Sequence, residues 1–292
     1  MPPSAYFVGS AVFHYLGPSF AVLLFARVEP LGVAWLRIVS AAVIFAVWRR
    51  PWRFLRDPLL LAWGLVLAVM NCCFYLAIDR LPLGTVAAIE FLPVIVLAAL
   101  GARTPRNIAA LVLAVPGVYL LTDVQLAGEP LGVAFAFANA VLFAIYIVLA
   151  HRVSRQQGVK KDLTPPSGID GLAASMLIAA VVATPLAGWA AVPAFDDPVA
   201  LAAGIGVGLT SSVIPYICDQ LAMKQLARST YALMVSLLPA TATVIGIVVL
   251  AQIPSWLEVL GVALVVAGVA VHRDPAEAEP EPDASALAAQ SG

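Results

Sequence analysis

The chain has 292 residues, of which 62% are apolar and 11% are charged, and its mean hydropathy is +0.97. These values lie far outside the usual balance of soluble proteins, so a soluble catalytic domain is excluded and no nucleic-acid partner is expected. The net charge of −1 hides an uneven placement of Lys and Arg, and that placement carries information on topology.

A membrane-spanning helix needs about 20 predominantly apolar residues. Ten segments of this kind follow one another along the chain, at residues 4–26, 31–48, 59–78, 83–101, 107–122, 130–150, 169–190, 199–221, 231–250 and 256–272. The sequence therefore predicts an all-α membrane protein with ten transmembrane helices.

The basic residues predict the orientation of these helices. If both termini are cytoplasmic, thirteen Lys and Arg residues fall on the inner side, and Arg27 and Arg80 fall on the outer side. Such an excess is the positive-inside pattern. We therefore predict a multi-pass protein of the bacterial cytoplasmic (inner) membrane with its N- and C-termini in the cytoplasm.

The ten segments divide into two units of five, residues 1–125 and 126–273, and the second unit repeats features of the first. Cys72 falls on Cys218 and Pro93 on Pro239 when the two units are superposed. Because each unit has an odd number of spans, the two units are inserted in opposite orientations, which is an inverted repeat typical of transporters. Residues 274–292 are acidic and rich in proline, and we expect a disordered cytoplasmic tail.

Prolines near the middle of predicted spans indicate helix breaks at Gly17 and Pro18, at Pro93 and at Pro239. A proline in a helix interior removes a backbone hydrogen bond. The freed carbonyl groups usually face protein or a water-filled cavity, although an ordinary packed kink is the alternative.

Glu90 lies in the apolar fourth segment, three residues before Pro93. A carboxylate inside a membrane costs roughly 2.5–3.5 kcal/mol on insertion scales and usually faces the bundle interior. We predict that Glu90 is a protonatable site or an anchor for a substrate ammonium group. The alternative is a structural ion pair with Arg37, which we expect to have a structural or gating role.

Other polar and aromatic side chains fall in the same predicted helices and would line a substrate or proton pathway. His14 would sense or carry protons, or form a hydrogen bond inside the bundle. Asp219 would contact the substrate or pair with Lys224. The remaining candidates are Tyr15, Asn71, Tyr75, Phe91, Asn139, Tyr146, Tyr216, Tyr231 and Ser236. Each of the neutral polar groups, taken alone, is more often a contact between helices.

Gly204 and Gly208 form a GxxxG pair in the eighth segment, which indicates close packing of helices within the fold. The sequence contains no Gly-x-x-x-x-Gly-Lys, His-Glu-x-x-His or Gly-x-Ser-x-Gly motif. We therefore predict no direct use of ATP, no enzymatic activity and no metal or other cofactor.

The doubled unit and the runs Phe74-Tyr75-Leu76, Pro82-Leu83-Gly84, Glu90-Phe91 and Pro215-Tyr216 resemble the EamA-type branch of the drug/metabolite transporter superfamily. Within that branch the chain is most similar to the threonine/homoserine exporter group, over residues 5–272. The resemblance implies ten helices in two inverted halves around a central cavity. The chain departs from the group at Leu238-Pro239, where Glu usually precedes the proline, and at Ala251-Gln252, where Gly-Glu is common. Asp219 also takes what looks like a glutamate position.

The resemblance and the placement of Glu90 together predict a secondary active transporter. It would export threonine- or homoserine-like amino acids or related metabolites by alternating access, coupled to protons. Its partners would be the small-molecule substrate, protons and membrane lipid, in a monomer or weak homodimer. The alternatives are an exporter of drugs, nucleobases or other metabolites and, more remotely, an intramembrane enzyme.

Overall fold

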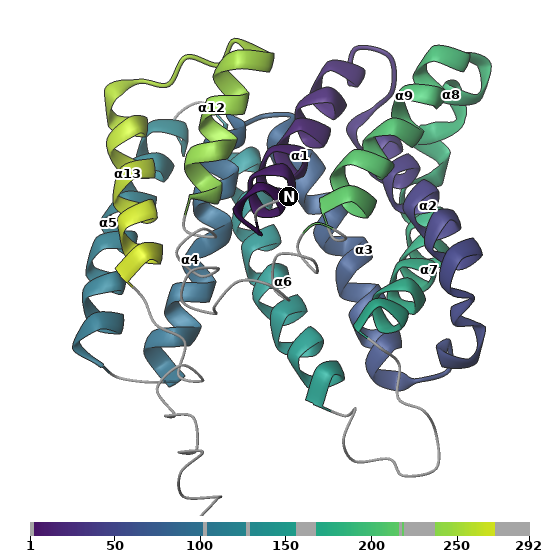
Figure 1. Ribbon diagram of the computed structural model, residues 1–292. Coiled ribbons are helices and arrows are strands. Elements are labelled where there is room, and N and C mark those ends of the chain that lie inside the picture. Colours follow the sequence, from purple (N-terminus) through teal and green to yellow (C-terminus); the bar gives the residue numbers. More distant parts are fainter. Residues whose placement is uncertain are drawn as a thin grey trace, which may run out of the picture.

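The computed structural model describes residues 3–101, 104–126, 129–155, 168–215, 218 and 237–271, which form a bundle of helices (Figure 1). Within these ranges the regular structure is helical throughout. The α-helices are α1 (Pro3–Leu24), α2 (Pro30–Arg49), α3 (Pro58–Ile78), α4 (Leu83–Gly101), α5 (Pro105–Leu126), α6 (Pro130–Arg155), α7 (Gly168–Ala187), α8 (Val192–Asp196), α9 (Pro198–Gly208), α12 (Leu238–Leu250) and α13 (Trp256–Val271). Short helical turns extend or join them: η1 (Pro51–Phe54), η3 (Gly188–Ala191) and the π-helical turn η4 (Leu209–Val213).

Four of the described helices are long and apolar enough to cross a membrane: Pro30–Arg49, Pro58–Ile78, Pro130–Ala150 and Ile169–Asp196. Shorter apolar helices occupy Val8–Leu24, Leu83–Pro93, Pro105–Leu121, Pro198–Val213, Leu238–Leu250 and Trp256–Val271. All of these helices fall where the sequence predicts one, so the predicted all-α fold is confirmed. The membrane-spanning length is supported for four of the ten predicted spans.

The outer surface of the bundle is apolar. Val47, Val248 and Ile253 are 74%, 77% and 86% exposed, and many other large apolar side chains are exposed along the helices. A soluble monomer rarely exposes such extensive apolar surface. The surface is therefore suited to contact with lipid chains.

The helix breaks predicted at Gly17 and Pro18 and at Pro93 are corrected by the structure. α1 continues through Gly17 and Pro18, and α4 continues through Pro93. Each proline removes only one backbone N–H donor, so the neighbouring hydrogen bonds can keep the helix intact. Pro239 lies in the first turn of α12, where its missing N–H has no intrahelical partner to lose.

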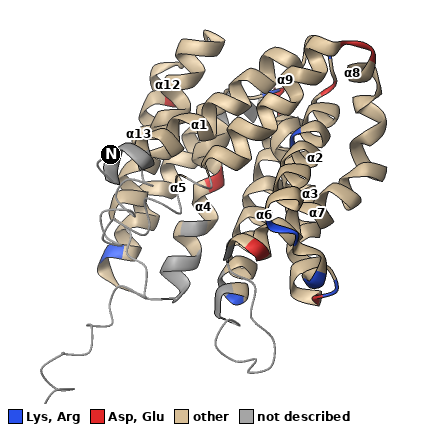
Figure 2. Ribbon diagram, turned by 45° about the vertical axis from the view of Figure 1, so that its right-hand side comes forward, with Lys and Arg blue, Asp and Glu red and all other residues tan. Residues whose placement is uncertain are grey.

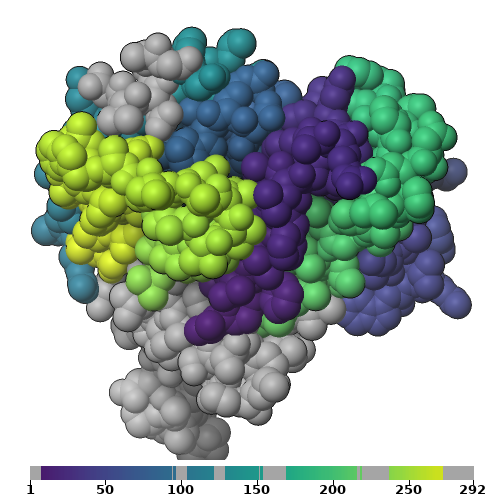
Figure 3. All heavy atoms as spheres, turned by 90° about the horizontal axis from the view of Figure 1, so that it is seen from above, coloured from purple at the N-terminus to yellow at the C-terminus, as the bar shows by residue number. Residues whose placement is uncertain are grey.

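The main helix pairings follow a regular pattern. α5 packs on α13 and α2 on α7, whereas α4 packs on α6 and α12. α3 packs on both α6 and α7, and α9 packs on both α1 and α2. Figure 3 shows α1 lying between α12 and α9 across the face seen from above, in agreement with its contacts to both helices.

Charged side chains gather at the two ends of the bundle, as can be followed in Figure 2. The end where α2 finishes and α3, α5 and α7 begin carries Arg49, Arg50, Arg53, Arg56, Arg106, Arg152, Asp57 and Asp170. The opposite end carries Arg27, Arg80, Glu29, Asp79, Glu129, Asp196, Asp197 and Glu258. One end of the described bundle is therefore mainly basic and the other mainly acidic.

An ion pair joins distant helices at each end. Arg49 contacts Asp170 at 2.8 Å, which connects α2 to α7. Arg27 contacts Asp197 at 2.7 Å, which connects α1 to α9. The ion pairs therefore hold together helices that lie far apart in the sequence.

Asp197 accepts three hydrogen bonds at the acidic end. Its carboxylate accepts a hydrogen bond from Arg27 and also from the amides of Val199 and Ala200, so it caps the N-terminus of α9. The Arg27 guanidinium, followed by the Ala200 amide, holds the pKa of Asp197 below its ordinary value. A carboxylate with a lowered pKa stabilises the fold above its ordinary pKa, and this contribution is lost as the pH falls through the lowered value.

The predicted close packing at Gly204 and Gly208 is confirmed. A Cβ atom at Gly204 would lie 2.6 Å from the Leu36 side chain, and one at Gly208 would lie 2.8 Å from the Arg37 carbonyl oxygen. Both neighbours belong to α2. The two glycines therefore allow α9 to approach the backbone of α2 closely.

Replacement of Gly208 tests this contact. We expect Gly208→Ala to lower the free energy of unfolding by about 1–3 kcal/mol, because the added methyl group meets the backbone of α2. Gly206→Ala, on the same helix, is the matched control, since a Cβ atom there meets nothing within 4 Å. Thermal unfolding in detergent measures both changes, and equal stabilities of the two variants would contradict the packing argument.

Two variants of Asp197 separate its cap of α9 from its ion pair with Arg27. Asp197→Asn keeps an oxygen that can accept hydrogen bonds from the amides of α9 but loses the charge that attracts Arg27, whereas Asp197→Ala loses both. We expect the unfolding midpoint to fall in the order wild type, Asp197→Asn, Asp197→Ala. Equal midpoints for the two variants would show that the cap contributes nothing.

Candidate functional site

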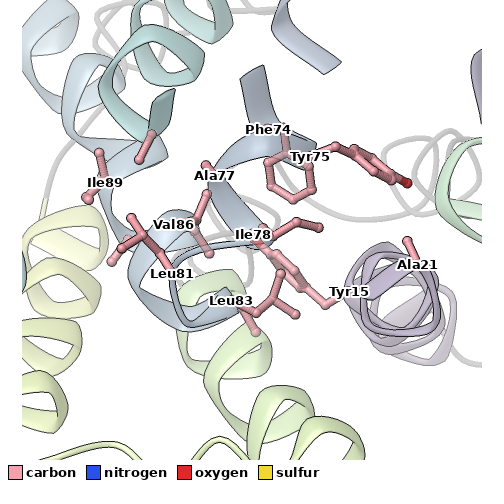
Figure 4. Packing of buried hydrophobic residues seen from close by; sticks show 14 of the residues in the cluster. Tyr15, Ala21, Phe74, Tyr75, Ala77, Ile78, Leu81, Leu83, Val86 and Ile89 are labelled. Atoms are coloured by element: carbon pink, nitrogen blue, oxygen red, sulfur yellow. The ribbon is translucent and has the colours of Figure 1, made fainter. Parts of the chain in front are cut away.

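A group of polar side chains lies inside the bundle, surrounded by apolar residues. We call it the polar cluster. Its members come from α1, α2, α3, α4, α6 and η4, and they are His14, Tyr15, Arg37, Tyr75, Glu90, Asn139, Ser211 and Ser212. Figure 4 shows Tyr15 and Tyr75 among the apolar residues that pack beside the cluster.

Glu90 is the acidic member of the polar cluster. Its side chain faces the bundle interior and is only 8% exposed, as the cost of a charge in lipid predicts. The Asn139 Nδ2 atom donates a hydrogen bond of 3.1 Å to Glu90 Oε1, which joins α4 to α6. Tyr15 lies close enough to Glu90 for an electrostatic interaction.

Arg37 is the cationic member, and its partners correct the predicted ion pair. Its Nε donates to Ser212 Oγ at 3.2 Å and its Nη2 donates to the Ser211 carbonyl at 3.3 Å. No salt bridge forms between Arg37 and Glu90, although the two charges are close enough to interact electrostatically. The ion pair is absent because α2 packs against α9 and η4, so the guanidinium meets their hydroxyl and carbonyl groups first.

The π-helical turn η4 shapes the polar cluster on the α9 side. The amide of Ile214 donates to the carbonyl of Leu209, five residues earlier, instead of four as in an α-helix. Gly17 of α1 faces this turn, and a Cβ atom on Gly17 would lie 2.9 Å from the Ser211 Cβ atom. Gly17 therefore allows α1 and η4 to come into direct contact.

Several buried polar atoms of the cluster have no hydrogen-bond partner among the described residues. They are the Tyr75 hydroxyl, Ser211 Oγ and Asn139 Oδ1. The Tyr75 hydroxyl lies close to Ser211 and Arg37, but not in hydrogen-bond geometry with either. Buried polar atoms almost always have a partner, so each exception calls for an explanation. Three such atoms in one cluster, beside one acid and one guanidinium, are suited to a polar ligand.

A row of aromatic rings leads away from the polar cluster along α6. Phe91 packs against Phe143, and Phe143 stacks on Tyr146 with ring centres 6.1 Å apart. Tyr146 in turn contacts Trp63 of α3 at 5.5 Å. The Trp63 Nε1 atom is also buried with no hydrogen-bond partner among the described residues. The row adds an apolar extension to the cluster.

Residues 130–272 match the EamA-like transporter family. The threonine/homoserine exporter RhtA of Escherichia coli (strain K12) is 30% identical over 262 residues, which cover 86% of this chain and 84% of that protein. The threonine/homoserine exporter RhtA of Salmonella typhimurium (strain LT2) is 29% identical over 275 residues, which cover 89% of this chain and 88% of the relative.

The chain belongs to the EamA-like transporter family. Its family and its apolar helices make it an integral membrane protein that transports small metabolites. A solved crystal structure of another protein has the same fold, with a TM-score of 0.56 and 19% sequence identity. The match covers 91% of this chain and 96% of the chain in that structure.

In this EamA-like transporter, the structure assembles some of the predicted site residues and separates others. His14, Tyr15, Tyr75, Glu90 and Asn139 meet in the polar cluster, with His14 near Arg37. Asn71 is buried, and its side-chain Nδ2 donates to the Leu67 carbonyl of its own helix. Phe91 and Tyr146 belong to the aromatic row. Tyr216, Asp219, Tyr231 and Ser236 lie outside the described residues.

Two members of the polar cluster, Ser211 and Ser212, are not predicted from the sequence. A serine in an apolar helix usually bonds the carbonyl of its own preceding turn, so it does not stand out as a site residue. The only signal in the sequence is that two hydroxyl groups follow Thr210 directly. Their role depends on the π-helical turn and on Arg37 across the helix interface.

The hydrogen bond from Asn139 to Glu90 can be tested by a double-mutant cycle. We expect Asn139→Ala to lower the free energy of unfolding by about 1.5–3 kcal/mol, because it leaves a buried carboxyl oxygen without its donor. In a Glu90→Gln background the same change should cost less, since the group left behind is neutral. Thermal unfolding of the four proteins measures the coupling, and equal costs in both backgrounds would contradict it.

Proposed function

We propose that the protein is a secondary active transporter that exports a small amino acid similar to threonine or homoserine. The observation that carries this proposal is the polar cluster inside an apolar bundle, which holds one acid, one guanidinium and three buried polar atoms without a hydrogen-bond partner among the described residues. An amino acid has a positive and a negative group, and both need partners of opposite charge when they leave water. The relatives named threonine/homoserine exporters support this choice of substrate.

Alternating access would come from two inverted repeats, residues 1–125 and 126–273. The pattern of helix pairings supports this arrangement. If α1 exchanges places with α6, α2 with α7, α3 with α9, α4 with α12 and α5 with α13, the main pairings are preserved. An inverted repeat of this kind allows a bundle to open alternately toward either side around a fixed site.

The basic end of the bundle would face the cytoplasm, with both termini on that side, in the cytoplasmic (inner) membrane. The gathering of arginine at this end supports the orientation. In this orientation α1 lies across the outer face, between α9 and α12. The outer ion pair between Arg27 and Asp197 then holds α1 against α9.

Proton coupling would depend on Glu90. A single carboxylate can carry a proton or bind a substrate ammonium group, but it cannot do both at once. A proton that arrives from the outer side would therefore displace the amino acid, and the proton gradient would drive export. The other titratable or charged groups near Glu90 in the described part of the chain are His14, Tyr15 and Arg37.

The aromatic row favours a second candidate substrate class. Phe91, Phe143 and Trp63 offer stacking surfaces beside the polar cluster, which would suit a planar nucleobase or drug. Competition between L-threonine, nucleobases and aromatic cations for the purified protein distinguishes the two classes. Displacement by planar compounds alone would favour the second.

Reconstituted vesicles test the proposed function. We expect the flux of L-threonine to increase when protons are more concentrated on the side toward which the amino acid moves. Glu90→Gln should lower this flux by roughly 10–100-fold, the effect of losing one interaction with a charged group, because a carboxamide takes up no proton. Glu129→Gln, an exposed acid at the acidic end, is the matched control.

Two results would overturn parts of this function. Flux that ignores the pH gradient would reject proton coupling. A Glu90→Gln variant with full flux would remove Glu90 from the mechanism. The hydrogen bond from Asn139 can form to the carbonyl oxygen of the introduced carboxamide as well, so the variant should remain folded.

A further inference from the structure

We propose that Arg37, Tyr75 and Ser211 form a binding subsite for the α-carboxylate of the transported amino acid. This inference rests on the proposed function and assigns the two charges of the polar cluster to different groups of the substrate. Arg37 would contact the substrate directly instead of serving as a structural partner of Glu90. The subsite lies between α2, α3 and η4.

Arg37 has hydrogen-bonding capacity to spare. A guanidinium has five N–H donors, and among the described residues two of them are used, one by Ser212 Oγ and one by the Ser211 carbonyl. Both bonds, at 3.2 and 3.3 Å, are longer than the usual 2.9–3.0 Å of such bonds. The other donors form no hydrogen bond to a described residue and would be available to a ligand.

No carboxylate in the described part of the chain forms an ion pair with Arg37, although it is only partly exposed within an apolar bundle. A guanidinium inside an apolar bundle is costly when no counter-ion is bound to it. A planar carboxylate fits the paired N–H groups of arginine, and such bonds are about twice as strong as neutral ones. The ligand that best satisfies the charge and the remaining N–H groups of Arg37 is therefore a carboxylate.

Two hydroxyl groups beside Arg37 point to the same ligand. The Tyr75 hydroxyl and Ser211 Oγ are buried and lie close to each other and to Arg37, but neither has hydrogen-bond geometry to any described residue. The Arg37 Cζ atom lies 5.6 Å from the centre of the Tyr75 ring, which restrains the guanidinium beside the hydroxyl. A carboxylate can accept about four hydrogen bonds, enough for Arg37 and both hydroxyl groups.

The negative charge of Glu90 and the positive charge of Arg37 are held by different helices. Glu90 is held by Asn139 between α4 and α6, whereas Arg37 is held by η4 beside α2. A zwitterion bound between them would point its ammonium group toward Glu90 and its carboxylate toward Arg37. The subsite thus fixes the orientation of the substrate and excludes amines that lack a carboxylate.

Binding of three probes to purified protein tests the subsite. L-threonine has both charges, L-threoninol lacks the carboxylate, and N-acetyl-L-threonine lacks the ammonium group. We expect wild type to bind L-threonine at least about tenfold more tightly than L-threoninol, from the strength of hydrogen bonds to charged groups. Arg37→Gln should remove this preference by weakening the binding of L-threonine and N-acetyl-L-threonine, which both have a carboxylate, and should leave the binding of L-threoninol unchanged.

Tyr75→Phe is the variant least able to disturb folding, since it removes only a hydroxyl that has no partner among the described residues. We expect it to weaken L-threonine by about tenfold and to leave L-threoninol unchanged, again from the loss of one bond to a charged group. Glu90→Gln should instead leave the binding of N-acetyl-L-threonine unchanged and weaken the binding of L-threonine and L-threoninol, which both have an ammonium group. If Tyr75 had only a structural role, its replacement would change the affinity for all three probes alike.

The outcomes separate this inference from the proposed function. If wild type prefers L-threonine to L-threoninol and both Arg37→Gln and Tyr75→Phe keep that preference, the subsite is wrong while amino-acid transport stands. If wild type binds no amino acid, the proposed function fails and the subsite fails with it. Loss of the preference in folded Arg37→Gln and Tyr75→Phe supports the subsite.

Discussion

The cost of placing charge inside an apolar bundle is the constraint on which the centre of this structure depends. Glu90 and Arg37 are surrounded by helices whose other surfaces are almost entirely apolar. Each charge is retained only because neutral polar groups of other helices reach it. Asn139 donates to Glu90, and the hydroxyl and carbonyl groups of η4 accept from Arg37. The relative positions of four helical elements, α2, α4, α6 and η4, are therefore tied to two charged side chains.

Close approach of helices is the second condition, and small residues provide it. Gly208 lets α9 touch the backbone of α2 beside Arg37, and Gly17 lets α1 touch η4 beside Ser211. The π-helical turn shifts Ser211 and Ser212 relative to a regular helix, at the level where Arg37 reaches them. Packing and polar contacts thus support each other at this interface, since a larger side chain at either glycine would separate the groups that bind Arg37.

The sequence predicts the features that depend on local composition, and it fails where the partner lies on another helix. The positions of the helices, the close packing at Gly208 and the interior position of Glu90 follow from apolar length, residue size and the cost of burying charge. The partner of Arg37 does not follow, because it depends on how α2 faces η4. Pro18 and Pro93 leave their helices intact, since the loss of one donor does not decide whether the surrounding turns persist.

The two predicted halves contribute differently to the polar cluster. Both charged residues, Glu90 and Arg37, belong to residues 1–125, while their hydrogen-bond partners Asn139, Ser211 and Ser212 belong to residues 126–273. Superposition of the halves by the spacing of Cys72 and Cys218 places Glu90 on Ser236 and Arg37 on Ala183, so neither charge has a counterpart. In the proposed cycle, movement of one half against the other would therefore change the neutral partners of both charges together. A bound zwitterion would replace those partners on both sides at once, and this exchange would couple occupancy of the site to the relative position of the halves.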